Sequence, residues 1–180
     1  MDAGTARPRH RGFTLIEAML VVAILAIGLA LGLPAMGGIL ERHRLTTSMH
    51  LVSADMAMAR STAIMRREAV VVCPGLPDAG CSNDRDWSQG WLVFRDPDGN
   101  RQPDAPGDLL RASNAPAAGS ERLQLTSTRP WLRYQPNGLA AHSNLTVNAC
   151  ARGQLQGKVV VNRLGRVRTE RPKRATACPG

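Results

Sequence analysis

The residues with the clearest chemical potential are cationic and lie near the carboxyl end of the chain. Within residues 163–174 there are six such side chains, which are Arg163, Arg166, Arg168, Arg171, Lys173 and Arg174. Lys158 precedes them, and Glu170 is the single acidic residue among them. An ordinary solvated surface mixes both signs of charge. Because guanidinium groups match the geometry of phosphate oxygens, this segment predicts a surface that binds a polyanion.

The rest of the chain does not share this excess of positive charge. The 23 Lys and Arg residues and 14 Asp and Glu residues give a net charge of +9 over 180 residues. Residues 151–180 carry +7, residues 1–12 carry +2, and the segment between them is balanced. Aromatic residues make up only 3% of the chain, which argues against a protein that binds single strands by stacking many bases.

Four cysteines form the second group of reactive side chains: Cys73, Cys81, Cys150 and Cys178. In an exported domain they predict disulfides, and the sequence allows three pairings. We expect Cys73–Cys81 and Cys150–Cys178, because these pairs join neighbours in each half of the domain. A metal site is disfavoured, since the chain has no C-x-x-C motif and no histidine beside these thiols.

Other reactive residues do not form a recognisable catalytic or metal site. A calcium loop could be built from the segment 96–100 with Asp104 and Asp108, but it lacks the glycine and the glutamate that an EF-hand requires. A hairpin turn explains the same residues. The remaining candidates considered are His43, His50, His142 and Ser88, which have no partner close in sequence. We therefore predict a protein that is not an enzyme and that needs no cofactor.

The amino-terminal part of the chain predicts a membrane anchor. From Ala18 to Leu40 there are 23 residues without a charge, and a helix of that length is about 35 Å long, enough to cross the hydrocarbon core. The basic flank at residues 7–11 would stay in the cytoplasm. A cleaved secretory signal is the alternative, but its apolar region is shorter.

The junction after this basic flank reads Gly12-Phe13-Thr14-Leu15-Ile16-Glu17. This sequence resembles the leader of type IV prepilins. In that family a prepilin peptidase cuts after the glycine and the new amino-terminal Phe is methylated, so the resemblance implies a cut between Gly12 and Phe13. It also implies that Glu17 pairs with the terminal amine of a neighbouring pilin subunit. A carboxylate at the bilayer edge costs a few kcal/mol, so it needs such a reason, although a Glu that reaches the interface is the alternative.

Periodicity after the anchor predicts one long helix followed by strands, an α+β fold. Apolar residues at helical spacing form a stripe, which consists of Leu45, Met49, Val52, Met56, Ala59 and Ala63. The opposite, polar face would carry Arg44, Thr47, Asp55, Arg60 and Arg67. Strands of one antiparallel sheet are expected at 69–73, 91–94, 109–111, 123–125, 131–134, 145–147, 158–161 and 166–168.

The predicted organisation has three parts. Residues 1–12 are a leader, 13–67 form the helix with a transmembrane part at about 15–40, and 68–180 form an exported β domain with a basic tail at 158–178. The segment 96–119 is rich in Pro, Gly, Ala and Asn, which predicts a mobile connection.

Two further stretches are informative: 59–64, before a Val-rich strand ending in Cys73-Pro74, and 87–94, which leads into the turn at 96–99. Both resemble the GspH/FimT group of minor pilins and pseudopilins. The segment Gly165-Arg166-Val167-Arg168 resembles the G-R-x-R signature of FimT-type minor pilins, which bind DNA for uptake in natural transformation. The resemblance implies Arg166 and Arg168 as the principal contacts, and charge alone adds the other five cations.

Two functions are therefore compatible with the sequence. The first is a minor type IV pilin of the inner membrane that binds DNA without sequence preference. The second is a minor pseudopilin of a type II secretion system, with a structural role at the tip and no DNA binding. For the basic segment itself, an acidic subunit, anionic lipid or simple solvation are alternatives to DNA.

Overall fold

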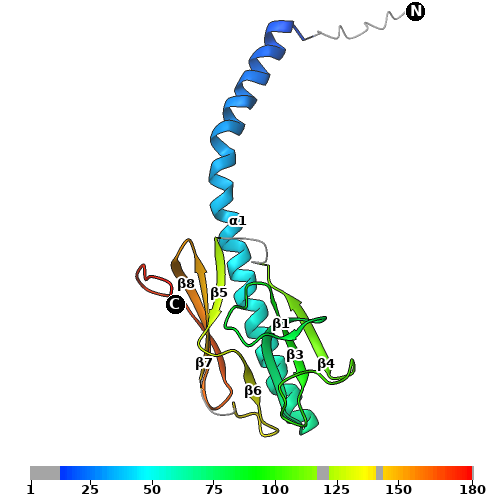
Figure 1. Ribbon diagram of the computed structural model, residues 1–180. Helices are drawn as coiled ribbons and strands as arrows, with labels where there is room; N and C mark the ends of the chain where they lie inside the picture. The colour runs from blue at the N-terminus through cyan, green and yellow to red at the C-terminus, as the bar shows by residue number, and fades with distance from the viewer. Residues whose placement is uncertain (1–12, 117–121, 141–143, 180) are drawn as a thin grey trace, which may run out of the picture. The chain divides into compact units, whose positions relative to one another are not determined.

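A computed structural model describes residues 13–116, 122–140 and 144–179, without the side chains of residues 31–37. The chain divides into two compact units, the first ending at Leu40 and the second beginning at Glu41. One α-helix, α1 (Leu15–Arg66), contributes residues to both units (Figure 1). The predicted cleavage residue Gly12 lies outside the described residues.

The first unit is the amino-terminal part of α1. Its described apolar side chains are exposed, and Phe13 just before the helix is 84% exposed. Among the helical residues that the structure describes, none form a stretch that meets the length and hydropathy needed to cross a membrane.

In the second unit, α1 presents one apolar face to the rest of the domain. All six residues of the predicted stripe are buried, with exposed fractions between 0% and 7%, so this prediction is confirmed. The predicted polar face is confirmed at Arg44, Thr47 and Arg67, which are exposed. It was wrong at Asp55, which is 1% exposed, because partners from two strands satisfy its carboxylate.

The strands form two antiparallel sheets and not the single sheet that was predicted. The first sheet contains β1 (Val70–Leu76), β2 (Gly80–Cys81), β3 (Gly90–Arg95), β4 (Leu109–Asn114) and β6 (Leu132–Tyr134). Its order is β2-β1-β3-β4, and β6 also pairs with β1. The second sheet has the order β5-β7-β8-β9, made of β5 (Leu123–Ser127), β7 (Leu145–Ala151), β8 (Gln154–Val161) and β9 (Val167–Glu170).

One hydrophobic core joins both sheets to the helix. Figure 1 shows α1, from Glu41 onward, running along the two sheets. Val52 and Met56 of the helix, Trp91 of β3 and Leu125 of β5 are buried in the same cluster. Burying each such side chain contributes about 1.5–3 kcal/mol. The helix therefore supplies the surface on which the two sheets meet, and the predicted α+β class is confirmed.

Asp55 is the most deeply buried charge at the junction of the helix with the first sheet. Its Oδ2 accepts hydrogen bonds from Trp91 Nε1 at 2.8 Å and from Ser113 Oγ at 2.6 Å. Its Oδ1 lies 3.0 Å from Nε of Arg111. Buried carboxylates persist only when they are paired and hydrogen-bonded, and these three partners meet that condition.

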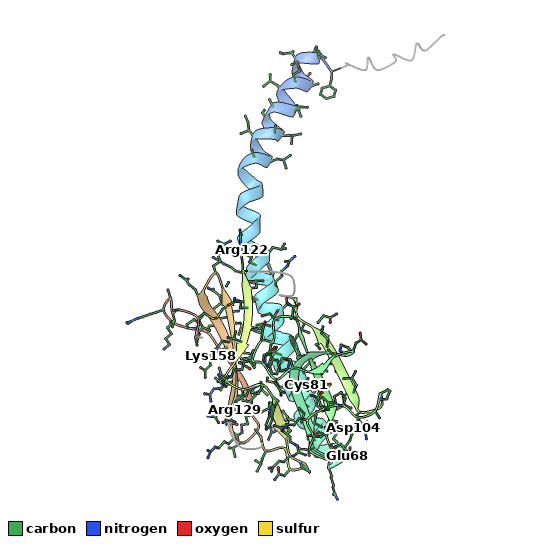
Figure 2. The ribbon with its side chains drawn as sticks, in the orientation of Figure 1. Glu68, Cys81, Asp104, Arg122, Arg129 and Lys158 are labelled. Carbon is green, nitrogen blue, oxygen red and sulfur yellow. A yellow bond between two sulfur atoms is a disulfide. The ribbon has the colours of Figure 1, made fainter. Side chains whose placement is uncertain are left out.

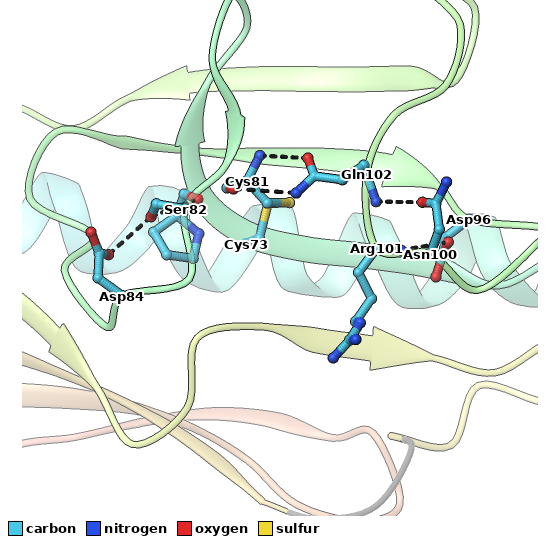
Figure 3. Close-up of a disulfide and its surroundings, with 9 residues drawn as sticks. Cys73, Cys81, Ser82, Asp84, Asp96, Asn100, Arg101 and Gln102 are labelled. Atoms are coloured by element: carbon cyan, nitrogen blue, oxygen red, sulfur yellow. Dashed lines mark hydrogen bonds between the residues drawn. A yellow bond between two sulfur atoms is a disulfide. The ribbon is translucent and has the colours of Figure 1, made fainter.

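The segment predicted as a mobile connection is instead bonded to the first sheet (Figure 3). The Gln102 side chain accepts from the backbone N–H of Cys81 at 3.0 Å and donates to the Cys81 carbonyl at 3.3 Å. The Asp96 carboxylate accepts from the backbone N–H of Arg101 at 3.1 Å. Residues 109–114 then form β4. The prediction was wrong because composition does not reveal such side-chain to backbone bonds; residues 117–121 lie outside the described residues.

Both predicted disulfides are present. Cys73 and Cys81 join β1 to β2, with Cα atoms 5.6 Å apart, and Cys150 and Cys178 join β7 to the carboxyl-terminal tail, with Cα atoms 5.9 Å apart. No cysteine is left free. The second bridge fixes the end of a tail that follows the last strand.

Candidate nucleic-acid interface

Strand β9 carries the centre of the predicted basic segment and is an edge strand. It pairs with β8 through the register Lys158↔Glu170 to Val161↔Val167. The turn between the strands is closed by Asn162, whose side-chain Oδ1 accepts from the N–H of Arg166 at 3.0 Å and whose carbonyl accepts from the N–H of Gly165 at 2.9 Å. The predicted hairpin is therefore present, and its turn fixes the backbone on which Arg166 stands.

Six of the seven predicted phosphate ligands are exposed along β9 and its flanks. We call them the β9 basic strip, and they are Arg163, Arg166, Arg168, Arg171, Lys173 and Arg174. Lys158, labelled in Figure 2 on β8, is only half-buried and lies beside the strip. The structure thus brings the seven residues onto one hairpin and the tail that follows it.

Two of these seven cations share one carboxylate. Glu170 lies 2.6 Å from Arg168 Nε and 3.2 Å from Lys158 Nζ. The hydrogen bonds from Arg168 and then Lys158 hold the pKa of Glu170 below its ordinary value of 4.5, so the carboxylate is ionised at neutral pH. Among the described residues, the other five cations have no carboxylate partner, and their charge is available to a ligand.

Gly165 sets the backbone conformation of the turn directly before Arg166. Its φ of +75° lies in the left-handed region, which a residue with a Cβ adopts at a cost. A Cβ there would also overlap the carbonyl oxygen of Gly138, and it would lie 2.9 Å from Arg60 Nε and 3.1 Å from the Tyr134 ring. The glycine of the G-R-x-R segment is therefore required by the backbone packing beneath Arg166. Burial also raises the pKa of the Tyr134 hydroxyl, so that it stays neutral.

The tail returns from β9 to the hairpin between β7 and β8. The N–H of Leu155 donates to the carbonyl of Thr176 at 2.9 Å, and the N–H of Cys178 donates to the carbonyl of Gly153 at 2.9 Å. Together with the Cys150–Cys178 bridge, these bonds hold the carboxyl-terminal end of the segment that carries Lys173 and Arg174, and the pairing of β9 with β8 holds its other end. Their two positive charges are thereby held near the domain.

A groove beside the strip was not anticipated from the sequence. Its volume is about 440 Å³, and we call it the α1–β9 groove. The helix contributes Ala57, Arg60, Ser61 and Ile64, and the strand side contributes Gly165 and Arg166. Arg60 donates through Nε to the carbonyl of Gly138 at 3.0 Å, across 78 residues of sequence. No local pattern could have indicated that Arg60 meets the basic segment.

Two further exposed arginines, Arg122 and Arg152, are neutralised within the domain by one carboxylate. Glu41 lies 2.9 Å from Arg152 and 3.5 Å from Arg122, and its bond with Arg152 holds its pKa below the ordinary value. Arg122 is labelled at the start of β5 in Figure 2. These two arginines therefore differ from the unpaired cations of the β9 basic strip.

The residues considered for calcium binding or catalysis do not form a site among the residues that the structure describes. Asp96 pairs with Arg133 at 3.1 Å, and Asp108 pairs with Arg95 at 2.8 Å. In the described parts of the chain, no three His, Cys, Asp or Glu side chains are grouped so that they could hold a metal ion. His142 lies outside the described residues.

Comparison with known proteins agrees with the sequence motifs and the fold. The family model described as type II transport protein GspH matches residues 49–165, well over half of the chain. The chain belongs to the GspH family. A second model, the prokaryotic N-terminal methylation motif, matches residues 7–33. The predicted membership in the type IV pilin-like GspH/FimT family is therefore confirmed.

Individual relatives are pilin-like as well. The pilin-like protein PilA1 of Thermus thermophilus is 29% identical over 89% of this chain and 99% of its own length. The type IV minor pilin FimU of Pseudomonas aeruginosa has a similar fold, with a TM-score of 0.60 and 20% identity over 77% of this chain and 98% of the FimU chain. A second crystal form of FimU gives a TM-score of 0.57. The GspH-family chain thus has the α+β fold of pilins and a minor pilin or pseudopilin role.

Proposed function

We propose that this protein is a minor type IV pilin that binds DNA without sequence preference through the β9 basic strip, for DNA uptake in natural transformation. The observation that carries the proposal is the set of five exposed cations without a carboxylate partner among the described residues, all on β9 or its flanks. Such a row can neutralise several phosphates of one backbone, and phosphate contacts hold DNA without reading its bases.

The proposal predicts both the salt dependence and the affinity of DNA binding. If about five phosphates are neutralised, the logarithm of the binding constant falls with the logarithm of salt concentration at a slope of about −4 to −5 on duplex DNA. The affinity of one subunit would be modest, about micromolar at physiological salt, and several copies in a filament would raise it.

The experiment compares two variants of the full-length protein in a non-ionic detergent, with a fluorescein-labelled duplex of mixed sequence. The first variant is Arg163→Gln/Arg166→Gln/Arg171→Gln, and we expect its Kd to rise at least about 30-fold. The matched control, with the same loss of charge at other exposed arginines, is Arg42→Gln/Arg85→Gln/Arg129→Gln. Similar losses in both variants would contradict the proposal. Absence of binding by the wild type would favour the secretion pseudopilin.

A substitution at Glu170 should strengthen binding. Glu170→Gln removes the carboxylate that holds Arg168 and Lys158, so both cations become available to phosphates. We expect Kd to fall about three- to tenfold and the salt slope to steepen by about one. Glu41→Gln is the control, because it also frees two cations, but those lie just before β5 and in the β7–β8 turn. Equal gains for both variants would mean that only net charge matters.

Glu170 also affects how the stability depends on pH. Because its pKa is lower in the folded state, its stabilising effect is present above its ordinary pKa of 4.5 and is lost as the pH falls through the lower folded-state pKa. Glu170 therefore stays ionised at neutral pH, and its protonation does not affect the comparison of DNA binding at that pH.

The same proposal includes the prepilin features of the amino terminus. A prepilin peptidase would cut between Gly12 and Phe13, with methylation of Phe13, and the match to the methylation motif supports this step. The apolar segment would anchor the subunit in the inner membrane, with the β domain outside the cytoplasm. Glu17, in the first turn of α1, would then pair with the terminal amine of a neighbouring pilin subunit in the filament.

A further inference from the structure

The α1–β9 groove carries arginines on two of its walls. Arg60 comes from the helix and Arg166 from the turn before β9. Arg60 uses Nε to hold the Gly138 carbonyl, and its terminal nitrogens have no partner among the described residues. The lining contains no acidic side chain. Two guanidinium groups that face one hollow without a carboxylate are complementary to an anion.

The other residues that line the groove strengthen the attraction between its two arginines and a bound anion. Ala57, Ile64 and Val167 are apolar, and a partly apolar surround lowers the local dielectric constant, which strengthens the attraction between a guanidinium and an anion. Ser61 donates its hydroxyl hydrogen to the Met58 carbonyl at 2.9 Å, so it serves the helix and is not a donor to the groove.

The helix and the strand remain neighbours beyond this groove. A second, smaller hollow is lined by Thr46 and His50 of α1 and by Thr169 and Arg171 on the strand side. From His50 to Arg60 the helix rises about 15 Å, which corresponds to about four nucleotides of one DNA strand. The seam between α1 and β9 therefore runs beside the β9 basic strip over the length of several phosphates.

We propose that the α1–β9 groove is a phosphodiester subsite in which Arg60 and Arg166 hold one backbone phosphate of the bound DNA. This inference rests on the proposed function and extends it by adding a helical residue to the contact surface. Arg60 thus has two roles: Nε supports the turn at Gly138, and the outer nitrogens contact the phosphate.

The test changes the charge in the groove while leaving both arginines in place. Ser61→Glu puts a carboxylate on an exposed helical residue that lines the groove, and Ala57→Lys puts an extra cation on another such residue. We expect Ser61→Glu to raise the Kd of the full-length protein for the labelled duplex about tenfold and to reduce the salt slope by about one. Ala57→Lys should lower the Kd about threefold. Near-ultraviolet circular dichroism checks that both variants remain folded.

The controls make the same charge changes at Gln124, an exposed residue of β5 on the opposite edge of the second sheet. Gln124→Glu and Gln124→Lys should change the Kd less than twofold. If the groove variants match these controls, while the β9 triple variant still loses binding, the subsite is wrong and the proposed function stands. A groove that receives a neighbouring pilin subunit would give that result, with altered assembly. If the wild type does not bind DNA, both proposals fail.

Discussion

Replacing Asp55 by alanine is expected to lower the free energy of unfolding by roughly 3 kcal/mol. The substitution leaves the buried indole N–H of Trp91 without its acceptor and removes the partner of Arg111 and Ser113. An unsatisfied buried donor costs about 1–3 kcal/mol, and the space left by the carboxylate adds to this. Arg111 is half exposed and can turn to water, which limits its share of the loss.

Chemical unfolding followed by tryptophan fluorescence measures this effect directly, because Trp91 is one of the partners. Asp55→Asn is the informative companion, since its amide oxygen can still accept from the indole, and it should lose about half as much stability. Asp78→Ala, at an exposed position, should change the stability by less than about 0.5 kcal/mol. If Asp55→Ala were as mild as Asp78→Ala, the carboxylate would not be what joins the helix to the first sheet.

Replacing Gly165 by alanine should have a comparably large effect and should also weaken DNA binding. The left-handed conformation alone costs about 1–2 kcal/mol for a residue with a Cβ. The overlap with the Gly138 carbonyl forces the turn to move and raises the total to roughly 3 kcal/mol. Because Arg166 follows directly, a displaced turn also moves this guanidinium.

Gly153 provides a matched comparison for this prediction. Its φ of +73° is nearly the same as that of Gly165, but a Cβ there would have nothing within 4 Å. Gly153→Ala should therefore lose only about 1 kcal/mol and keep its affinity for DNA. Thermal unfolding and the duplex titration together decide the matter, and equal losses for the two alanine variants would show that backbone conformation alone explains Gly165.

Local pattern was sufficient for much of this domain. The helical stripe from Leu45 to Ala63 was predictable because burial of one helix face leaves a period in the sequence. The β8–β9 hairpin was predictable from a different local pattern, since two Val-containing strands flank a turn with Asn and Gly. The disulfide pairing followed from proximity in the chain.

Features that depend on distant partners could not be predicted. Aspartate is a residue type found mostly on protein surfaces. Asp55 is stable in the interior only because Trp91 and Ser113, which are distant in sequence, donate hydrogen bonds to its carboxylate. The division into two sheets depends on which strands pair, and strand periodicity carries no information on partners. Arg60 joins the candidate site through a contact with Gly138, 78 residues away.

Salt dependence of DNA affinity tests most directly whether exposed, unpaired cations along β9 bind the phosphate backbone. For the wild type, the logarithm of the binding constant should fall linearly with the logarithm of salt concentration at a slope of about −4 to −5, and the triple variant at Arg163, Arg166 and Arg171 should fall at about −1 to −2. A slope near zero for the wild type, or the same slope for both proteins, would contradict the account.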